Sequence, residues 1–320
     1  MKKVGSLFGN FRYAGKRSRI ISKIREGFVT TVLFVLLLGL AFVIIYPFLY
    51  KILASFMSSA DIYDSTVGVI PKNWSFEHYK SVLDSSNFLK GLFRYTLPYA
   101  FVVSLMSVLS SVLVGYGLAR FKFPGQRIIF ILVVLTLMIP NSTISIGLYS
   151  TFRYFDLFGL IKLFTGGSIK LTSTVFPMAI LSATCIGFRG GIYVILMRQY
   201  FIGVPNELTE AARVDGAGVF RTFFSIMLPM AQSMIVVVAT LSFAWQWTDT
   251  FYTNILMGEI PMLSNIILEL SSVRSNQPNF YSVILLANAA AVMAIVPLVI
   301  IYTVLQKKII AGVESSGLVG

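Results

Sequence analysis

The chain contains 320 residues, of which 56% are apolar and 12% are charged. A soluble domain carries about 25% charged residues, so this composition excludes an ordinary soluble enzyme and a disordered chain and predicts a protein surrounded mostly by lipid. One cysteine and one histidine exclude a disulfide framework and a clustered metal site, so we expect no bound metal. The net charge of +13 does not indicate nucleic-acid binding, because eight basic residues precede residue 26 and many others flank hydrophobic runs.

Six segments are apolar and long enough to cross a bilayer, which takes about 20 residues of helix. These segments are 28–50, 97–119, 128–149, 171–197, 231–257 and 281–305. The first has 23 residues, whereas the apolar part of a signal peptide has about 7–15, so we interpret it as a retained helix. The sequence therefore predicts an all-α polytopic membrane protein with six transmembrane helices.

The predicted helices divide the chain into regions. These are a basic N-terminal segment at 1–27, the first helix at 28–50, an outer loop at 51–96, a five-helix core at 97–305 with an inner loop at 198–230, and a tail at 306–320. Lysine and arginine concentrate on the cytoplasmic side of membrane proteins. With the N-terminus inside, sixteen basic residues flank the inner side and nine, including Arg274, flank the outer side. We therefore expect both termini in the cytoplasm.

The inner loop contains the strongest local pattern, VPNELTEAARVDGAGVFRTFFSIMLP at 204–229. Pro205 suits the first turn of a helix, and Glu207 and Glu210 suit the positive end of its dipole. Gly216 fits the left-handed position that ends a helix. Short or small side chains recur at helical spacing on one face: Leu208, Ala211, Ala212 and Asp215. We predict a short helix that docks on a partner; the alternative is an amphipathic helix lying on lipid headgroups, for which bulky apolar and basic residues would be typical.

The spacing of this loop resembles the EAA loop of ABC importer permeases. Glu210-Ala211-Ala212 is followed after three residues by Gly216, and after nine more by Ile226-x-Leu228-Pro229. The segment GYGLARFKFPG at 115–125 and the tail, with Lys307, Lys308, Gly312 and Gly320, resemble carbohydrate importers. Over roughly residues 70–320 the chain is similar to the smaller, six-span subunit of maltose-transporter-type permeases.

The resemblance implies a permease subunit of a binding-protein-dependent, ATP-driven importer that works by alternating access. The implied cargo is a sugar or oligosaccharide, acidic ones included. The expected partners are a second homologous permease chain, a homodimeric or paired cytoplasmic ABC ATPase, an extracytoplasmic solute-binding protein and the lipid bilayer. The expected location is the cytoplasmic (inner) membrane of a prokaryote. The resemblance assigns these residues to ATPase coupling: Glu207, Glu210, Ala211, Ala212, Asp215, Gly216, Leu228 and Pro229.

The chain itself shows no nucleotide or catalytic site. Its one Gly-Lys pair, Gly15-Lys16, lacks the upstream glycine of a phosphate loop. His78 and Cys185 do not make a nucleophile set, and we interpret them as a loop residue and a small residue within a helix. We therefore expect no catalytic residue and no cofactor on this chain, with ATP and magnesium on the partner ATPase.

A substrate path is predicted from charged and aromatic residues within the fourth and fifth helices. Arg189 is costly in lipid and should face a polar cavity or a partner, where it either recognises cargo or makes a fixed bond to another helix. Asp249 lies near aromatic residues that suit stacking on a sugar ring, although Trp and Tyr also populate membrane interfaces. The predicted set is Arg189, Trp245, Trp247, Asp249 and Tyr252. Small residues at Ser107, Ser111 and Gly115 predict close helix contacts instead.

Three alternatives to a sugar importer remain open at this stage. The same kind of permease could carry an amino acid, peptide or oxyanion. An ion-gradient-driven transporter or channel would require buried acidic residues in several helices, and only Asp249 fits this requirement. The third alternative is a membrane scaffold, whose loop helix would bind a partner other than an ATPase.

Overall fold

The structure is a computed structural model. It describes the backbone of residues 4–272 and 280–317, and the side chains of residues 26–85, 87–272 and 280–312. Arg274 and Gly320, assigned above to an outer loop and to the tail, lie outside the described residues. The chain forms two compact units, residues 1–75 and 76–320.

The first unit consists of one long helix and a short loop. α1 (Val4–Ser55) includes the whole predicted segment 28–50 and extends beyond it at both ends. The apolar side chains from Phe28 to Tyr50 are exposed, which suits a helix that lipid or another chain surrounds. The loop after it is held by the buried Asp61, whose carboxylate accepts hydrogen bonds from the backbone and side-chain nitrogens of Asn73 at 2.9 and 2.7 Å.

The regular secondary structure of the second unit, over its described residues, is helical, apart from one isolated bridge between Phe155 and Ile169. Its helices are α2 (Glu77–Asp84), α3 (Ser86–Leu89), α4 (Leu97–Arg120), α5 (Gln126–Met138), α6 (Asn141–Arg153), α7 (Leu160–Thr165), α8 (Phe176–Ala183), α9 (Gly190–Gly203), α10 (Asn206–Val214), α11 (Val219–Thr222), α12 (Leu228–Met230), α13 (Gln232–Thr248), α14 (Phe251–Met257), α15 (Leu263–Ser271) and α16 (Phe280–Gly317). Wider π-helical turns at Lys90–Thr96 and Phe223–Met227 lead into α4 and α12. The predicted all-α class is confirmed.

Length and apolarity alone do not reproduce the predicted count of six spans. Among the described residues, three helical stretches are long and apolar enough to cross a membrane: Glu26–Ser55, Asn87–Arg120 and Phe280–Gly312. The number rises to five if each of two pairs of helices that meet at a sharp bend is counted as one span. α5 and α6 meet at 102°, because Ile139 takes an extended conformation before Pro140, as residues preceding proline prefer. The stretch Val219–Met230 meets α13 at 72°.

The fourth predicted segment, 171–197, is not one helix. It contains α8 and the first part of α9, separated by residues 184–189. Cys185 and Arg189 have left-handed φ values of 61° and 60°, which an α-helix cannot contain. Arg189 therefore lies in a break between two short helices, and not inside a continuous span as predicted.

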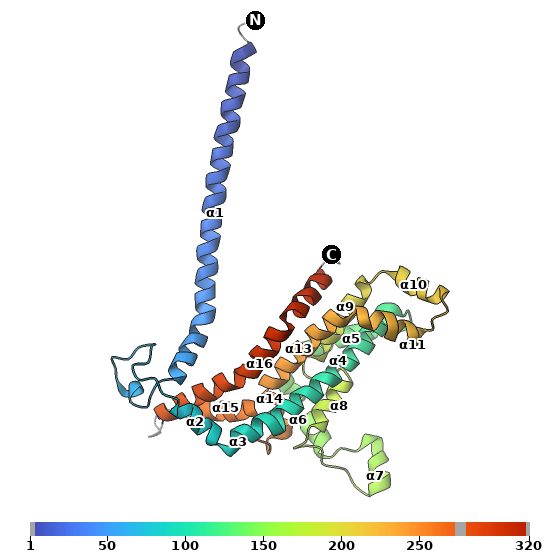
Figure 1. Ribbon diagram of the computed structural model, residues 1–320. Helices are drawn as coiled ribbons and strands as arrows, with labels where there is room; N and C mark the ends of the chain where they lie inside the picture. Colours follow the sequence, from blue (N-terminus) through green and yellow to red (C-terminus); the bar gives the residue numbers. More distant parts are fainter. Residues whose placement is uncertain (1–3, 273–279, 318–320) are drawn as a thin grey trace. The chain divides into compact units, whose positions relative to one another are not determined.

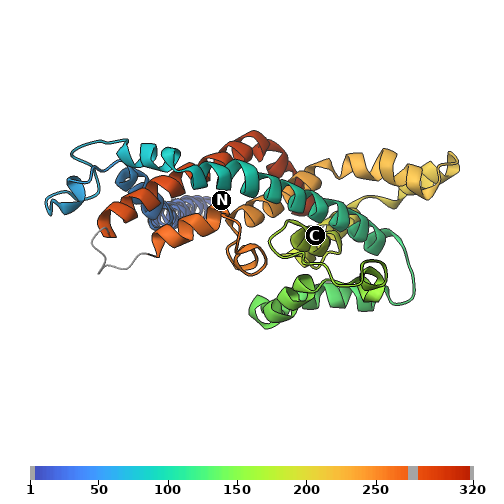
Figure 2. The same ribbon diagram turned by 90° about the horizontal axis from the view of Figure 1, so that it is seen from below.

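The helices of the second unit gather at two opposite ends. Figure 1 shows α10, α11 and the C-terminal part of α16 at one end, here named the α10 end, and α2, α3 and α15 at the opposite end, named the α15 end. α4 runs between them and packs against α8, α9 and α13; Figure 2 shows it passing along the middle of the unit. Within the second unit, the predicted inner loop 198–230 thus contains helices of the α10 end, and residues 77–89 of the predicted outer loop lie at the α15 end.

Candidate functional site

The predicted docking helix is present as α10. Pro205 immediately precedes it, in an extended conformation at the N-cap. Gly216 follows it with φ of +76°. The Gly216 N–H donates to the Arg213 carbonyl at 3.0 Å, and the Ala217 N–H donates to the Ala212 carbonyl at 2.9 Å. This pair of bonds is a Schellman motif, so the predicted C-terminal stop at Gly216 is confirmed.

The surface of α10 combines exposed carboxylates with exposed apolar groups. Glu207, Glu210, Ala211 and Asp215 are exposed, whereas Ala212 is buried against the rest of the unit. Sequence reasoning missed Val214, which is 87% exposed, and Phe220 on α11, which is 79% exposed. Large exposed apolar side chains mark a surface that another protein or a membrane covers, and the carboxylates beside them favour a protein.

Leu228 and Pro229 do not join this surface. Leu228 is half-buried and packs against a core cluster that includes Tyr116, Met197 and Phe223. Pro229 lies in the short helix α12, directly before the bend into α13, and lacks the N–H that would continue the helical bonding. These two residues therefore anchor and turn the loop, while the residues of α10 present its surface.

Arg120, the last residue of α4, fixes the start of α10. Its guanidinium donates hydrogen bonds to the Asn206 side-chain oxygen and to the Val204 carbonyl. Below it, the ring of Tyr116 lies 5.3 Å from that of Phe201, between centroids. Sequence reasoning used the segment 115–125 only as a mark of resemblance, since nothing local links Arg120 to a residue 86 positions away.

The structure brings together three of the five predicted substrate-path residues. The guanidinium carbon of Arg189 lies 4.6 Å from the centroid of the Trp245 ring and 5.3 Å from that of Phe188. The Phe188 ring lies 5.6 Å from that of Tyr252, whose hydroxyl donates to Asn141 at 3.1 Å. Arg189 is exposed and forms no ion pair with any described side chain. Phe188 was missed, although it directly precedes Arg189.

The other two residues lie apart from this group. The Trp247 indole donates to the Ala294 carbonyl of α16 at 3.1 Å. Residues two apart on a helix point about 200° from each other, so the sequence itself places Trp245 and Trp247 on opposite faces. The buried Asp249 carboxylate accepts hydrogen bonds from three backbone N–H groups at 3.2, 3.3 and 2.9 Å. These groups belong to the first turn of α14, so Asp249 caps that helix.

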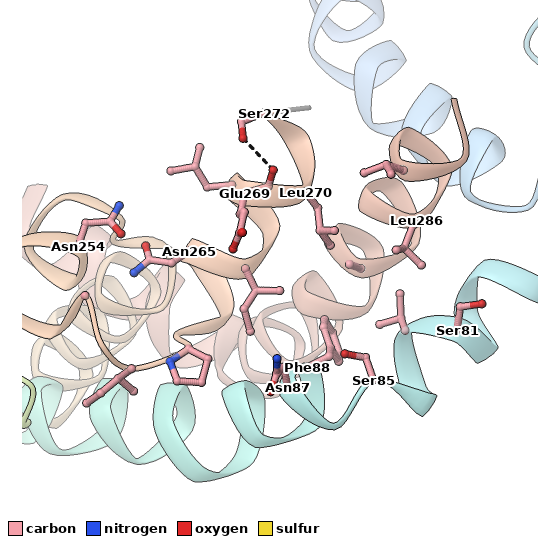
Figure 3. A pocket seen from close by; sticks show the side chains of 18 of the residues that line it. Ser81, Ser85, Asn87, Phe88, Asn254, Asn265, Glu269, Leu270, Ser272 and Leu286 are labelled. Carbon is pink, nitrogen blue, oxygen red and sulfur yellow. Dashed lines mark hydrogen bonds between the residues drawn. The ribbon is translucent and has the colours of Figure 1, made fainter. Parts of the chain in front are cut away.

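A cavity of about 1080 Å³ opens at the α15 end, between α2, the start of α3, α15 and α16. In Figure 3, Asn254, Asn265 and Glu269 lie on one side of it and Ser85 and Asn87 on the other. Sequence reasoning did not find this cavity, because its lining comes from three separate stretches of the chain, 81–88, 254–272 and 283–290.

Glu259 fixes one wall of this cavity. The Ser173 hydroxyl donates to its carboxylate at 2.8 Å, and the Lys170 ammonium lies 3.3 Å from it. These two hydrogen bonds, the one from Ser173 first, hold the pKa of Glu259 below its ordinary value. The loop that contains residues 170–173 is thereby attached to the turn between α14 and α15.

No group of three or more His, Cys, Asp or Glu side chains that could hold a metal ion occurs among the described residues. Cys185 is a free thiol within the break between α8 and α9. His78 is buried in the helix α2, so the interpretation of it as a solvated loop residue is wrong.

The comparisons with known proteins agree with this arrangement. Residues 111–314 match the family model described as binding-protein-dependent transport system inner membrane component. An arabinooligosaccharides transport system permease protein of Halalkalibacterium halodurans is 28% identical over 283 residues, covering 88% of this chain and 93% of the relative. A maltodextrin transport system permease protein of Bacillus subtilis is 29% identical over 298 residues, covering 91% and 96%.

The fold is also that of a solved transporter chain. A crystal structure of a bacterial ABC transporter involved in the import of the acidic polysaccharide alginate matches with a TM-score of 0.69 and 24% identity, covering 87% of this chain and 96% of that chain. The family match spans well over half of the sequence and contains both α10 and the Arg189 group. The chain therefore belongs to the family of binding-protein-dependent transport system inner membrane components.

Proposed function

We propose that this chain is the permease subunit through which an ATP-driven importer takes up a sugar or oligosaccharide by alternating access. The observation that carries the proposal is the surface of α10: exposed Glu207 and Glu210 beside bare Val214, on a helix fixed at both ends. The relatives named above as permeases for arabinooligosaccharides and maltodextrin support an oligosaccharide cargo.

The partner on α10 is proposed to be a cytoplasmic ABC ATPase that holds ATP and magnesium. A groove on the ATPase would receive the exposed carboxylates and Val214, while Arg120 and the Gly216 turn transmit its movement to α4 and the rest of the unit. The chain itself would carry no catalytic residue. This arrangement requires the α10 end to face the cytoplasm, with both termini on that side of the inner membrane.

A second permease chain and an extracytoplasmic solute-binding protein complete the proposed importer. The exposed apolar helix α1 supports contact with lipid and with the second permease chain. The α15 end would face outward, where the cavity gives the solute-binding protein a concave, largely apolar surface that also carries Asn265 and Glu269. The distance along α4 between the two ends separates cargo delivery from ATP-driven movement.

The cargo path is proposed to pass the Arg189 group. Trp245 offers an aromatic face for a sugar ring, and the unpaired guanidinium of Arg189 suits a carboxylate on that sugar. Asp249 and Trp247 would act on the path only indirectly. Asp249 caps α14, and Trp247 attaches α13 to α16.

The coupling proposal is tested by charge reversal at Glu210 in the purified importer. We expect Glu210→Lys to weaken retention of the ATPase, and ATP-dependent uptake, by about tenfold, because a like or unpaired charge at a docked surface costs binding free energy. Asp84→Lys at the opposite end is the matched control and should keep the ATPase bound. Full uptake by Glu210→Lys would support the scaffold alternative, and uptake by this chain reconstituted alone without ATP would support a gradient-driven transporter.

The cargo proposal is tested by Arg189→Met in the assembled importer supplied with neutral and carboxylated oligosaccharides. We expect a selective loss of uptake for the carboxylated sugars, with neutral sugars less affected. Arg153→Met, at the end of α6, is the control for loss of a positive charge. Unchanged preference and uptake in Arg189→Met would remove Arg189 from the path.

A further inference from the structure

A second groove, of about 490 Å³, lies at the α10 end between the end of α4, the loop to α5, α9, α10 and α11. Four cationic side chains line it: Arg120, Lys122, Arg198 and Arg213. Glu210 is the one acidic residue among the lining side chains. Arg120 and Lys122 are neighbours at the end of α4, and the fold brings Arg198 of α9 and Arg213 of α10 to the same groove.

None of these four cations forms an ion pair with a described side chain. The Nε atoms of Arg120 and Arg198 are buried without a hydrogen-bond acceptor. The guanidinium carbon of Arg198 lies 4.2 Å from the centroid of the Phe130 ring. This cation–π contact orients the guanidinium, but the ring accepts no hydrogen bond from the N–H groups that lie in the guanidinium plane. Buried donors without acceptors cost free energy. What the groove offers an anion is the positive charge of the four side chains, which no described carboxylate pairs with.

The groove also contains the start of a helix. α5 begins at Gln126, which lines the groove, and its N-cap is Gly125 with φ of +86° and no side-chain cap. The first turn of α5 contains no acidic residue. The positive end of this 13-residue helix therefore adds to the field of the four cations.

We propose that this groove binds a phosphate-bearing anion. Arginine guanidinium groups match the oxygens of phosphate in a forked geometry, and an anionic phosphate group suits four cations facing one carboxylate. Two sources supply this chemistry at the α10 end: the headgroup of an anionic phospholipid and a free phosphorylated solute. Because Arg120 also holds Asn206, a bound anion would act on the helix that is proposed to dock the ATPase.

The test measures binding and not transport, so its outcome is independent of the proposed cargo. Because Glu210 and Arg213 of the docking helix also line the groove, retention of the ATPase is measured in the same preparations, so that loss of anion binding and loss of docking are distinguished. The intact importer is purified into nanodiscs of phosphatidylcholine alone or with phosphatidylglycerol. Native mass spectrometry counts the phosphatidylglycerol retained after release from the nanodisc, and equilibrium dialysis with labelled inorganic phosphate measures binding of the free anion.

The test variant is the pair Lys122→Gln and Arg213→Gln, since both residues are exposed and neither holds the fold. We expect this double variant to weaken anion binding by about tenfold or more, from the loss of two charge-assisted contacts. Arg198→Gln is a second, independent variant and should also weaken binding. Arg221→Gln, exposed at the same end but outside the groove lining, should bind as the unchanged chain does.

Retention of phosphatidylglycerol that the groove variants abolish would assign a lipid, and phosphate binding that they abolish would assign a soluble anion. Either result supports the site. Absence of binding in both assays, or binding that the groove variants leave unchanged, would overturn it.

Discussion

Arg120 and Asn206 are joined by a hydrogen bond between the last residue of α4 and the first residue of α10. The same guanidinium also donates to the carbonyl of Val204, so one side chain holds both the connection into α10 and its first turn. A movement imposed on α10 therefore reaches α4, which runs between the two ends of the unit (Figure 1).

Arg120→Lys should reduce coupled uptake several-fold, because a lysine ammonium cannot reproduce the fork that reaches two acceptors. A double-mutant cycle with Arg120→Ala and Asn206→Ala should give an interaction free energy of about 0.5–3 kcal/mol in the stability of the purified complex. Arg127→Ala removes a nearby exposed charge and serves as the control. Strictly additive effects of the two alanine substitutions would contradict a direct bond.

Gly216→Ala should weaken ATPase docking, because a side chain at φ of +76° costs roughly 1–2 kcal/mol and disturbs the turn that ends α10. Gly218→Ala is a matched control, since Gly218 has φ of −72° and nothing lies near its added methyl group. Both variants are compared by thermal melting and by ATPase retention. Equal behaviour of the two would mean that the left-handed turn at Gly216 is unimportant.

Asp249→Ala should lower the thermal stability of the complex by about 0.5–2 kcal/mol, because three backbone N–H groups of α14 lose their acceptor. Its cargo preference should stay unchanged. Thr248→Ala, at the exposed neighbouring position, should have little effect on stability. A shift in cargo preference without a loss of stability would show instead that Asp249 contacts the cargo.

Gly115→Ala should destabilise the contact between α4 and α9 by about 1–3 kcal/mol, since its methyl group would lie 2.7 Å from Met197 Cβ and 2.9 Å from the Arg198 backbone nitrogen. Gly117→Ala faces open space and should stabilise α4 by up to about 1 kcal/mol through helix propensity. Thermal unfolding of the two variants should therefore shift in opposite directions.

The contact between Glu259 and Ser173 should depend on pH. The pKa of Glu259 is lowered in the folded protein from an ordinary 4.5, first by the Ser173 hydroxyl and then by Lys170. The ionised Glu259 carboxylate therefore contributes its full stabilisation above the ordinary pKa. This stabilisation is lost as the pH falls through the lower pKa that Glu259 has in the folded protein.

Hydrogen exchange of the segment around Ser173, corrected for intrinsic rates, should be slower at about pH 6 than at about pH 3. Glu259→Gln should remove most of this difference. Glu269→Gln, across the same cavity, should leave it in place. Exchange that is independent of pH in the unchanged chain would contradict the attachment.

The sequence alone determined the helical class, most of the apolar segments and the bounds of α10. These features have local causes: long apolar runs, Pro205 at the start of a helix, and Gly216, which readily takes the left-handed conformation that ends many helices. The same local reasoning placed Arg189 inside a helix, because composition does not reveal a left-handed residue within an apolar stretch.

Only the tertiary structure decided which distant residues meet. Arg189 lies over Trp245, 56 positions away. Trp247 donates a hydrogen bond to α16, and the Asp249 carboxylate accepts hydrogen bonds from the backbone of α14. Arg120 reaches Asn206 because α4 and α9 pack side by side and end together. Such contacts depend on how helices cross and on the phase of each side chain around its helix, and no short stretch of sequence contains that information.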